Sequence, residues 1–195
     1  MESGVSERDL RLLRYLANNC RVNLRKVARL LGVSHTAVRK RLSRLLDGGY
    51  VSLTASLDLE RMGFRLALLF LEVASDEDLE MLLRKYRDCP RIVSICKILG
   101  EYNVVALIYA ENEKVMDSIL GSCMMRTAEG IRKSLVVPVS RVLRGGWYAV
   151  EVPLRSRDVA PCGADCLNCG RYRRGECPGC PSVKWYRGPF SVGGD

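Results

Sequence analysis

The sequence predicts an α+β protein with three parts: a basic helical module, an antiparallel α+β sandwich and a short cysteine-rich tail. Residues 1–50 contain three segments with helical spacing of apolar side chains. Residues 65–145 alternate strand-like and helix-like segments, and five cysteines fall within residues 162–180. Of the 195 residues 48% are apolar and 27% charged, a composition that excludes wholesale disorder.

The positive charge of the chain is concentrated in its first quarter. Residues 1–50 carry 11 basic and 4 acidic side chains, whereas residues 51–150 carry 13 of each. A local excess of this kind indicates a module that binds a polyanion such as nucleic acid, joined to a part that does not.

The N-terminal residues lack the apolar stretch of a signal peptide, and no apolar run approaches the ~18 residues of a membrane span. We therefore expect a cytoplasmic protein with no membrane partner. In a reducing compartment clustered cysteines more often bind a metal than form disulfides.

Three short helices are predicted in the first fifty residues. Ser6, Asn23 and Ser34 are suitable N-caps, and Asp9 stands three residues after Ser6 as in a capping box. Gly32 separates the second helix from the third by a tight turn, as in a helix-turn-helix. The apolar residues expected to face inward are Leu10, Leu13, Leu16, Ala17, Val27, Leu30, Leu31, Val38, Leu42 and Leu45.

The outward face of the third helix, residues 34–47, is polar and basic. In a helix-turn-helix such a helix presents its N-terminal residues to base edges while neighbouring basic side chains contact phosphates. The alternative is a solvated basic face on a small bundle. The predicted DNA contacts are Ser34, His35, Thr36, Arg39, Lys40 and Ser43, with Arg41 and Arg44 nearer the phosphates.

Residues 6–63 resemble the N-terminal half of the leucine-responsive regulatory protein/asparagine-synthesis regulator (Lrp/AsnC) family. The shared motifs are D-x-x-L-L-x-x-L at 9–16, V-A-x-x-L-G-V-S at 27–34, V-x-x-R-L-x-x-L at 38–45 and L-D-x-x-x-M-G at 57–63. The resemblance implies a sequence-specific, DNA-binding transcriptional regulator that works as a homodimer or higher homo-oligomer on double-stranded DNA.

The middle of the chain predicts a ferredoxin-like sandwich. Its strands are expected at residues 65–74, 92–99, 104–110 and 131–143, and its helices at 75–86 and 113–124. This β-α-β-β-α-β order places two helices on one face of an antiparallel sheet. The open face is then expected to be covered by a second copy of the chain.

The same segment resembles the family's C-terminal domain, known as the regulation of amino-acid metabolism domain. The family's T-G-x-(Y/F)-D turn, which lies near the effector site, reads Leu99-Gly100-Glu101-Tyr102-Asn103 here. The resemblance makes residues 100–103 the candidate contacts of a small-molecule effector. Asn103 supplies a dipole but no charge for an amino acid's ammonium group, so a plain hairpin turn is the alternative.

We expect no enzymatic activity. Some proteins of this fold, such as the sirohaem decarboxylases, modify tetrapyrroles with histidine and arginine side chains of the C-terminal domain. The one histidine here, His35, lies in the predicted DNA-reading helix, and residues 65–150 contain none. A tetrapyrrole-modifying enzyme is therefore the least supported alternative.

The cysteine tail is predicted to bind a metal. Its spacing is Cys162-x3-Cys166-x2-Cys169-x7-Cys177-x2-Cys180, and so short a segment is expected to need a metal in order to fold. The last four cysteines suit a structural zinc ion, the leading interpretation. The first three, with Cys177 or Cys180, suit an iron–sulfur cluster instead. A metal- or redox-responsive DNA-binding sensor is the corresponding alternative function.

The predicted organisation has six segments. They are the DNA-binding domain at 1–50, a linker at 51–64, the sandwich at 65–145, a linker at 146–161, the metal-binding tail at 162–181 and an extension at 182–195. Four scattered cysteines are expected to act as small apolar residues: Cys20, Cys89, Cys96 and Cys123.

Overall fold

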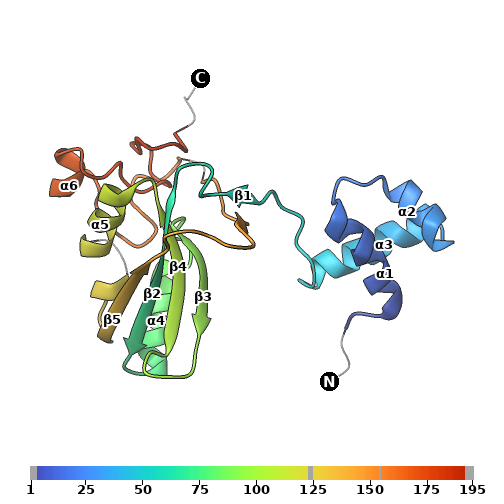
Figure 1. Cartoon of the computed structure of the whole chain (residues 1–195), viewed down its shortest axis with the longest axis horizontal. Coiled ribbons are helices and arrows are strands. Elements are labelled where there is room, and N and C mark those ends of the chain that lie inside the picture. The colour runs from blue at the N-terminus through green and yellow to red at the C-terminus, as the bar shows by residue number, and fades with distance from the viewer. Residues whose placement is uncertain (1–3, 123–124, 154, 192–195) are drawn as a thin grey trace. The chain divides into compact units, whose positions relative to one another are not determined.

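A computed structural model describes residues 4–122, 125–153 and 155–191 of the chain. The chain divides into two compact units, Met1–Ala55 and Ser56–Asp195 (Figure 1). None of the helices in the described part of the chain combines the length and the apolar character needed to cross a membrane.

The first unit contains the three predicted helices, α1 (Glu7–Asn18), α2 (Leu24–Leu31) and α3 (His35–Asp47). The predicted N-caps are confirmed, because the side chains of Ser6, Asn23 and Ser34 each accept a hydrogen bond from the first turn that follows them. Gly32, with φ of 65°, ends α2 in the left-handed region and turns the chain into α3.

The core of this unit is formed by seven apolar side chains: Leu12, Leu16, Val27, Ala28, Val38, Leu42 and Leu45. The prediction that Leu10, Ala17 and Leu30 face inward is wrong. Leu10 and Leu30 are 58% and 57% exposed, and Ala17 is also exposed. On α1 the buried face runs through Asp9, Leu12 and Leu16, at the i, i+3, i+7 spacing of one helical stripe.

Asp9 holds a fully buried carboxylate in this unit. Its Oδ2 accepts hydrogen bonds from the backbone N–H and the hydroxyl of Ser6 at 2.6 and 2.7 Å, which completes the capping box. Nη1 of Arg41 lies 2.7 Å from Oδ1, and Nη2 of Arg44 lies 2.5 Å from Oδ2. Burial alone would raise the pKa of Asp9, but the hydrogen bonds from Ser6, Arg41 and Arg44 hold it well below its usual range.

The second unit contains the predicted β-α-β-β-α-β order. Its strands β2 (Arg65–Val73), β3 (Ile92–Lys97), β4 (Val104–Ala110) and β5 (Ile131–Pro138) form an antiparallel sheet in the order β3-β4-β2-β5. The helices are α4 (Asp76–Tyr86), α5 (Glu113–Ser122) and the short 3-10 helix η1 (Met125–Thr127). The last strand ends at Pro138, earlier than predicted. Strand β5 is an edge strand, where proline is tolerated, and the backbone N–H of Val139 still donates to the Leu66 carbonyl at 2.9 Å.

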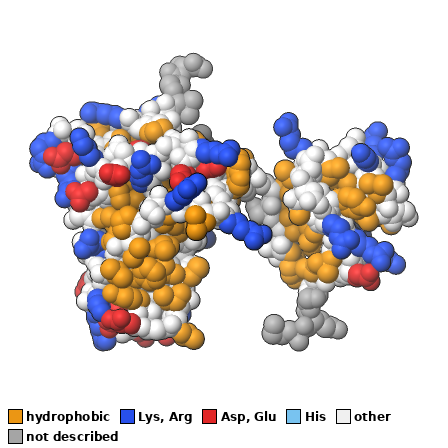
Figure 2. All heavy atoms as spheres, viewed as in Figure 1, with side chains coloured by type: hydrophobic (Ala, Val, Ile, Leu, Met, Phe, Trp, Pro, Cys, Tyr) orange, Lys and Arg blue, Asp and Glu red, His pale blue; other side chains and the backbone are white. Residues whose placement is uncertain are grey.

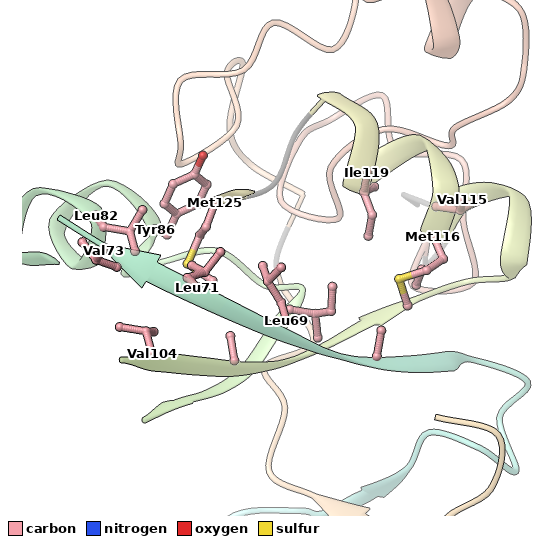
Figure 3. Packing of buried hydrophobic residues seen from close by; sticks show 14 residues of the cluster. Leu69, Leu71, Val73, Leu82, Tyr86, Val104, Val115, Met116, Ile119 and Met125 are labelled. Carbon is pink, nitrogen blue, oxygen red and sulfur yellow. The ribbon is translucent and has the colours of Figure 1, made fainter. Parts of the chain in front are cut away.

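Helices α4 and α5 cover one face of the sheet. Leu69 and Leu71 of β2 point toward Leu82 and Tyr86 of α4 and toward Ile119 of α5 (Figure 3). The alternate residues of β2 and β4 lie on the opposite face, because successive strand side chains point to opposite sides.

The C-terminal region packs on one end of that opposite face. Strand β1 (Leu57–Asp58) pairs with β6 (Trp147–Tyr148), and the short helix α6 (Gly170–Arg173) lies within the cysteine tail. The rings of Phe64 and Phe190 are stacked at 5.0 Å, and Tyr109 contacts both edge-on. The shared cluster of buried side chains is Leu59, Phe64, Leu66, Tyr109, Ala160, Cys166, Cys180, Val183, Tyr186 and Phe190.

These contacts correct the predicted domain boundaries. Residues 57–64 and 146–161 are not free linkers, because each contributes a strand and buried side chains to the second unit. The tail at 162–181 and the extension at 182–195 are not a separate module: the described part of the extension supplies Val183, Tyr186 and Phe190 to the shared core. The tail was expected to need a metal in order to fold, but its buried side chains pack in a core that it shares with the sandwich.

We expect Asp9→Asn to lower the free energy of unfolding of the helical unit by about 3 kcal/mol, because Arg41 and Arg44 lose their counter-charge. The depressed pKa of Asp9 means that its stabilisation is complete above about pH 4, the unfolded value, and is lost as the pH falls further. The variant should lack this acid-dependent loss.

Amide hydrogen exchange in α3 measures this change locally. The matched control is Asp47→Asn, which neutralises an exposed carboxylate of the same unit. Equal protection of the α3 amides in Asp9→Asn and in the wild type would contradict the role given to Asp9.

Candidate nucleic-acid interface and cysteine cluster

The outward face of α3 presents polar and basic side chains to solvent. Thr36, Arg39 and Lys40 are exposed, and His35 is half-buried at the start of the helix. Among the residues that the structure describes, neither Arg39 nor Lys40 has an ion-pair partner. Two basic groups without counter-charges on one helix face make a suitable contact surface for phosphates and base edges.

The two predicted serine contacts have local partners. The Ser34 hydroxyl accepts a hydrogen bond from the backbone N–H of Ala37 at 3.1 Å, so it serves as the helix cap. The Ser43 hydroxyl donates to Oδ2 of Asp47 at 3.0 Å. Both hydroxyls lie on exposed residues, within reach of a ligand on the same surface.

Arg41 and Arg44 differ from the expectation that they project toward phosphates. Both guanidinium groups turn to the buried Asp9 on α1, and the side chains are only 29% and 49% exposed. A carboxylate sealed from water needs cationic partners, and this requirement decides the orientation of both arginines. The sequence analysis predicted only a capping role for Asp9. Its position on the same helical stripe as Leu12 and Leu16 is the pattern that indicates burial.

The predicted effector turn is held by contacts within the chain. Oδ1 of Asn103 accepts from the backbone N–H of Val73, and Nδ2 donates to the Val73 carbonyl, both at 2.8 Å. The amide therefore joins the end of β2, where an aspartate would repel that carbonyl. The Tyr102 ring packs 5.9 Å from Phe70, and Lys133 forms an ion pair with Glu101.

A cavity of about 580 Å³ lies at the other end of the sheet, away from the effector turn. Its walls include the apolar side chains of Phe64 and Met116 and the charged side chains of Glu60, Arg65 and Arg141. Its size is within the range of small-molecule sites. No local sequence pattern predicts this cavity, because its walls come from segments far apart in the chain.

The five tail cysteines are brought into one region. Cys166 and Cys180 are buried, and the other three are half-buried. The backbone N–H of Gly179 donates to the Cys177 thiol, that of Ser182 to Cys180, and that of Cys180 to Cys166. Burial, followed by the neighbouring thiols, raises the pKa of Cys166 to about 11.

The thiols are nevertheless not assembled as a metal site. Among the described residues, no three His, Cys, Asp or Glu side chains are placed so that they could hold a metal ion. The donor set itself fits zinc or an iron–sulfur cluster, because thiolates that accept backbone N–H bonds are the usual ligands of both.

A buried network fastens this region to the sheet. Arg91 precedes β3 and Glu111 follows β4; their side chains are 3% and 5% exposed and are joined by two hydrogen bonds of 2.6 and 2.9 Å. Arg91 also donates to the carbonyl of Gly179, between Cys177 and Cys180, at 2.8 Å. The hydroxyl of Tyr186 donates to Glu111 at 2.5 Å.

The scattered cysteines differ from one another. Cys20 and Cys96 are exposed, so they do not pack as the small apolar residues that were expected. Cys89 is half-buried and packs against the core, and Cys123 lies outside the described residues.

The helical unit is similar to a known protein family. A family described as winged helix-turn-helix DNA-binding matches residues 5–52. The transcriptional regulator Ptr1 of Methanocaldococcus jannaschii is 31% identical over 100 residues, which are 51% of this chain and 68% of that protein. The regulator FL11 of Pyrococcus furiosus is 25% identical over 159 residues, 80% of this chain and 100% of its own.

Solved structures share the fold over nearly three quarters of the chain. Escherichia coli AsnC superposes with a TM-score of 0.64 at 15% identity, over 73% of this chain and 97% of its own. LrpA of Mycobacterium tuberculosis also gives 0.64, at 21% identity, over 73% and 97%. The regulator relatives favour transcriptional regulation over tetrapyrrole chemistry. The extent of the match to Ptr1, together with these folds, shows that the chain belongs to the Lrp/AsnC family of DNA-binding helix-turn-helix transcriptional regulators.

Proposed function

We propose that this regulator reads specific DNA sequences with the outward face of α3 in the major groove. Ser34, His35, Thr36, Arg39 and Lys40 would lie nearest the bases, with Ser43 farther along the helix. The observation that carries the proposal is the pair of exposed, unpaired basic side chains Arg39 and Lys40. Side chains of this kind at the N-terminal half of a recognition helix are well placed for bidentate contacts to base edges.

Arg41 and Arg44 have a modified part in this proposal. Their ion pairs with Asp9 join α3 to α1, so they fix the orientation of the recognition helix. Arg44 is 49% exposed and retains enough accessible surface to contact a phosphate from that position.

The chain is further proposed to act as a homodimer or higher homo-oligomer through the open face of the sheet. Leu135 and Val137 of β5 are 44% and 39% exposed on this face, beside the half-buried Leu68 and Phe70 of β2. Figure 2 shows hydrophobic side chains gathered over this part of the second unit. A contiguous apolar surface favours association with another copy, which would place two α3 helices on one DNA duplex.

A small-molecule effector at the turn of residues 100–103 stays a prediction. Gly100 and Glu101 are exposed there and Tyr102 is half-buried, whereas both polar groups of Asn103 are already bound to Val73. An effector at this turn would therefore meet the backbone, Glu101 and Tyr102.

A second proposed function is metal binding by the tail, with zinc as the leading ion and an iron–sulfur cluster as the alternative. The donors are Cys162, Cys166, Cys169, Cys177 and Cys180, and three of their thiols already accept backbone N–H bonds. Bound zinc would act as a structural cross-link. If metal occupancy also alters DNA affinity, the protein is a metal- or redox-responsive sensor.

Replacing Arg39 and Lys40 together by alanine should weaken binding to the protein's own promoter DNA at least roughly tenfold, because base-edge contacts are lost. Fluorescence anisotropy at several salt concentrations measures the affinity and its salt dependence. Each lost phosphate contact would lower the log–log slope by about 0.9.

The charge-matched control is Arg14→Ala with Arg21→Ala, at exposed positions outside α3. Unchanged binding by the α3 variant, or equal wild-type affinity for promoter and random DNA, would exclude sequence-specific reading by this helix.

Replacing Leu135 and Val137 together by glutamate should raise the dimer dissociation constant roughly a hundredfold, because two carboxylates would lose water in an apolar interface. Analytical ultracentrifugation measures the change. Leu143→Glu, at a side chain that is 90% exposed, is the control. A monomeric wild type, or a double variant that dimerises normally, would argue against this interface.

Protein purified without oxygen should contain about one zinc per chain and be colourless if the tail holds a structural ion. Iron with acid-labile sulfide and a brown colour would identify the cluster instead. Elemental analysis with a visible spectrum decides between them, and a DNA titration before and after chelation tests the sensor function. The absence of both metals would contradict the proposed site.

A further inference from the structure

Two side chains of the sandwich face the cysteine tail and have no part in the functions above. Cys89 lies between α4 and β3, and Tyr109 lies on β4. Cys89 packs against the same buried cluster as Cys162 and Cys177, and Tyr109 belongs to the buried cluster that contains Cys166 and Cys180. Residues from two distant parts of the sequence thus lie in clusters that tail cysteines share, and Cys162 packs against both clusters.

Cys89 repeats the local structure of two tail cysteines. The sequence contains three Cys-Pro-x elements, at residues 89–91, 177–179 and 180–182. In each of them the backbone N–H of the third residue donates to the thiol of the first. This turn supplies a backbone donor to the sulfur, as the knuckles of metal–thiolate sites do, and proline suits its tight bend.

Tyr109 carries a buried hydroxyl that has no acceptor. Its side chain is 0% exposed, and the hydroxyl finds no hydrogen-bond partner among the described residues. The ring is held between Phe64 and Phe190, so the hydroxyl cannot turn to solvent. A buried donor without an acceptor is destabilising, and such a group marks a place where an acceptor binds.

The two charged side chains near Tyr109, Arg91 and Glu111, form an ion pair with each other. The Glu111 carboxylate accepts hydrogen bonds from Arg91 and Tyr186, and the Tyr109 hydroxyl does not bond to it. Arg91 is buried, and it donates to the Gly179 carbonyl inside the second Cys-Pro-x element. A buried guanidinium group bonded to this element would stabilise the negative charge of a metal–thiolate centre.

We propose that Cys89 is a ligand of the metal held by the tail, with Cys162 and Cys180 beside it, and that the Tyr109 hydroxyl donates a hydrogen bond to a ligand sulfur. This inference rests on the metal site proposed above. The thiols would draw together as the metal binds, since the described structure does not gather them at coordinating positions. The metal would then fasten the tail to the turn between α4 and β3.

The first test uses the wild-type chain, reduced and metal-depleted, with and without one equivalent of zinc. Cysteines are alkylated briefly and the labelled peptides are quantified by mass spectrometry. We expect zinc to slow the labelling of Cys89 at least tenfold, together with the tail cysteines, while exposed Cys20 and Cys96 are labelled at the same rate in both samples. Equal labelling of Cys89 with and without bound zinc would overturn the inference.

The second test substitutes cobalt for zinc and compares Cys89→Ser with Cys96→Ser. Cys89→Ser should weaken metal binding at least tenfold and reduce the sulfur-to-cobalt absorption, whereas Cys96→Ser should match the wild type. If the wild type binds cobalt and Cys89→Ser gives the same affinity and spectrum, the inference fails and the tail site stands. If the wild type binds neither zinc nor cobalt and holds no iron, the proposed metal site fails as well.

Tyr109→Phe separates the hydroxyl from the packing of the ring. Without metal this variant should unfold at the same temperature as the wild type or a higher one, because it removes an unsatisfied donor. Its metal affinity should nevertheless fall roughly tenfold, as expected for the loss of a hydrogen bond to a ligand. Unchanged affinity would exclude the proposed bond from Tyr109.

Discussion

The buried ion pair between Arg91 and Glu111 is the interaction on which the second unit depends. It joins the start of β3 to the end of β4, and it extends to the tail through Gly179 and Tyr186. Burying two charges is costly unless all of their hydrogen-bonding groups have partners. The additional partners of this ion pair are Gly179 and Tyr186, so the contacts that satisfy it also hold the C-terminal region on the sheet. The cysteine segment is consequently part of the sandwich.

The helical unit is organised by a similar constraint. Asp9 has no access to water and must be neutralised by Arg41 and Arg44, which come from the helix that carries the DNA-reading surface. The same contacts divide the basic residues of α3 into two classes. Arg41 and Arg44 form ion pairs with Asp9, whereas the exposed side chains of Arg39 and Lys40 are accessible to a ligand.

The two faces of the sheet have different roles for a related reason. One face is filled by α4 and α5 and closes the core of the unit. On the other, the tail covers the end near Leu66 and Tyr109, while Leu135 and Val137 remain accessible. A surface that is covered at one end and open over the rest limits where a second copy can dock. The tail cysteines lie at the covered end and do not extend over the open part of this face.

The helices and strands of this protein are predictable from local patterns in its sequence. Caps such as Ser6, Asn23 and Ser34 act on the first turn that follows them, and strands β2 and β4 are continuous apolar runs, so local patterns suffice to predict them. The order of the elements and the Lrp/AsnC motifs were readable for the same reason. The register of α1 was misread because Leu10 and Leu12 both fit a helical stripe, and only packing against α2 and α3 selects Leu12.

The contacts between distant residues depend on how the separate segments pack in the folded chain. The direction of Arg41 depends on a carboxylate thirty-two positions away, and the place of the tail depends on Phe64, Tyr109 and Glu111. No local pattern encodes such pairings, because burial and charge compensation arise only when separate segments share one interior. For that reason the cysteine spacing predicted a metal-binding tail, while the neighbourhood of Cys89 and Tyr109 became visible only in the folded chain.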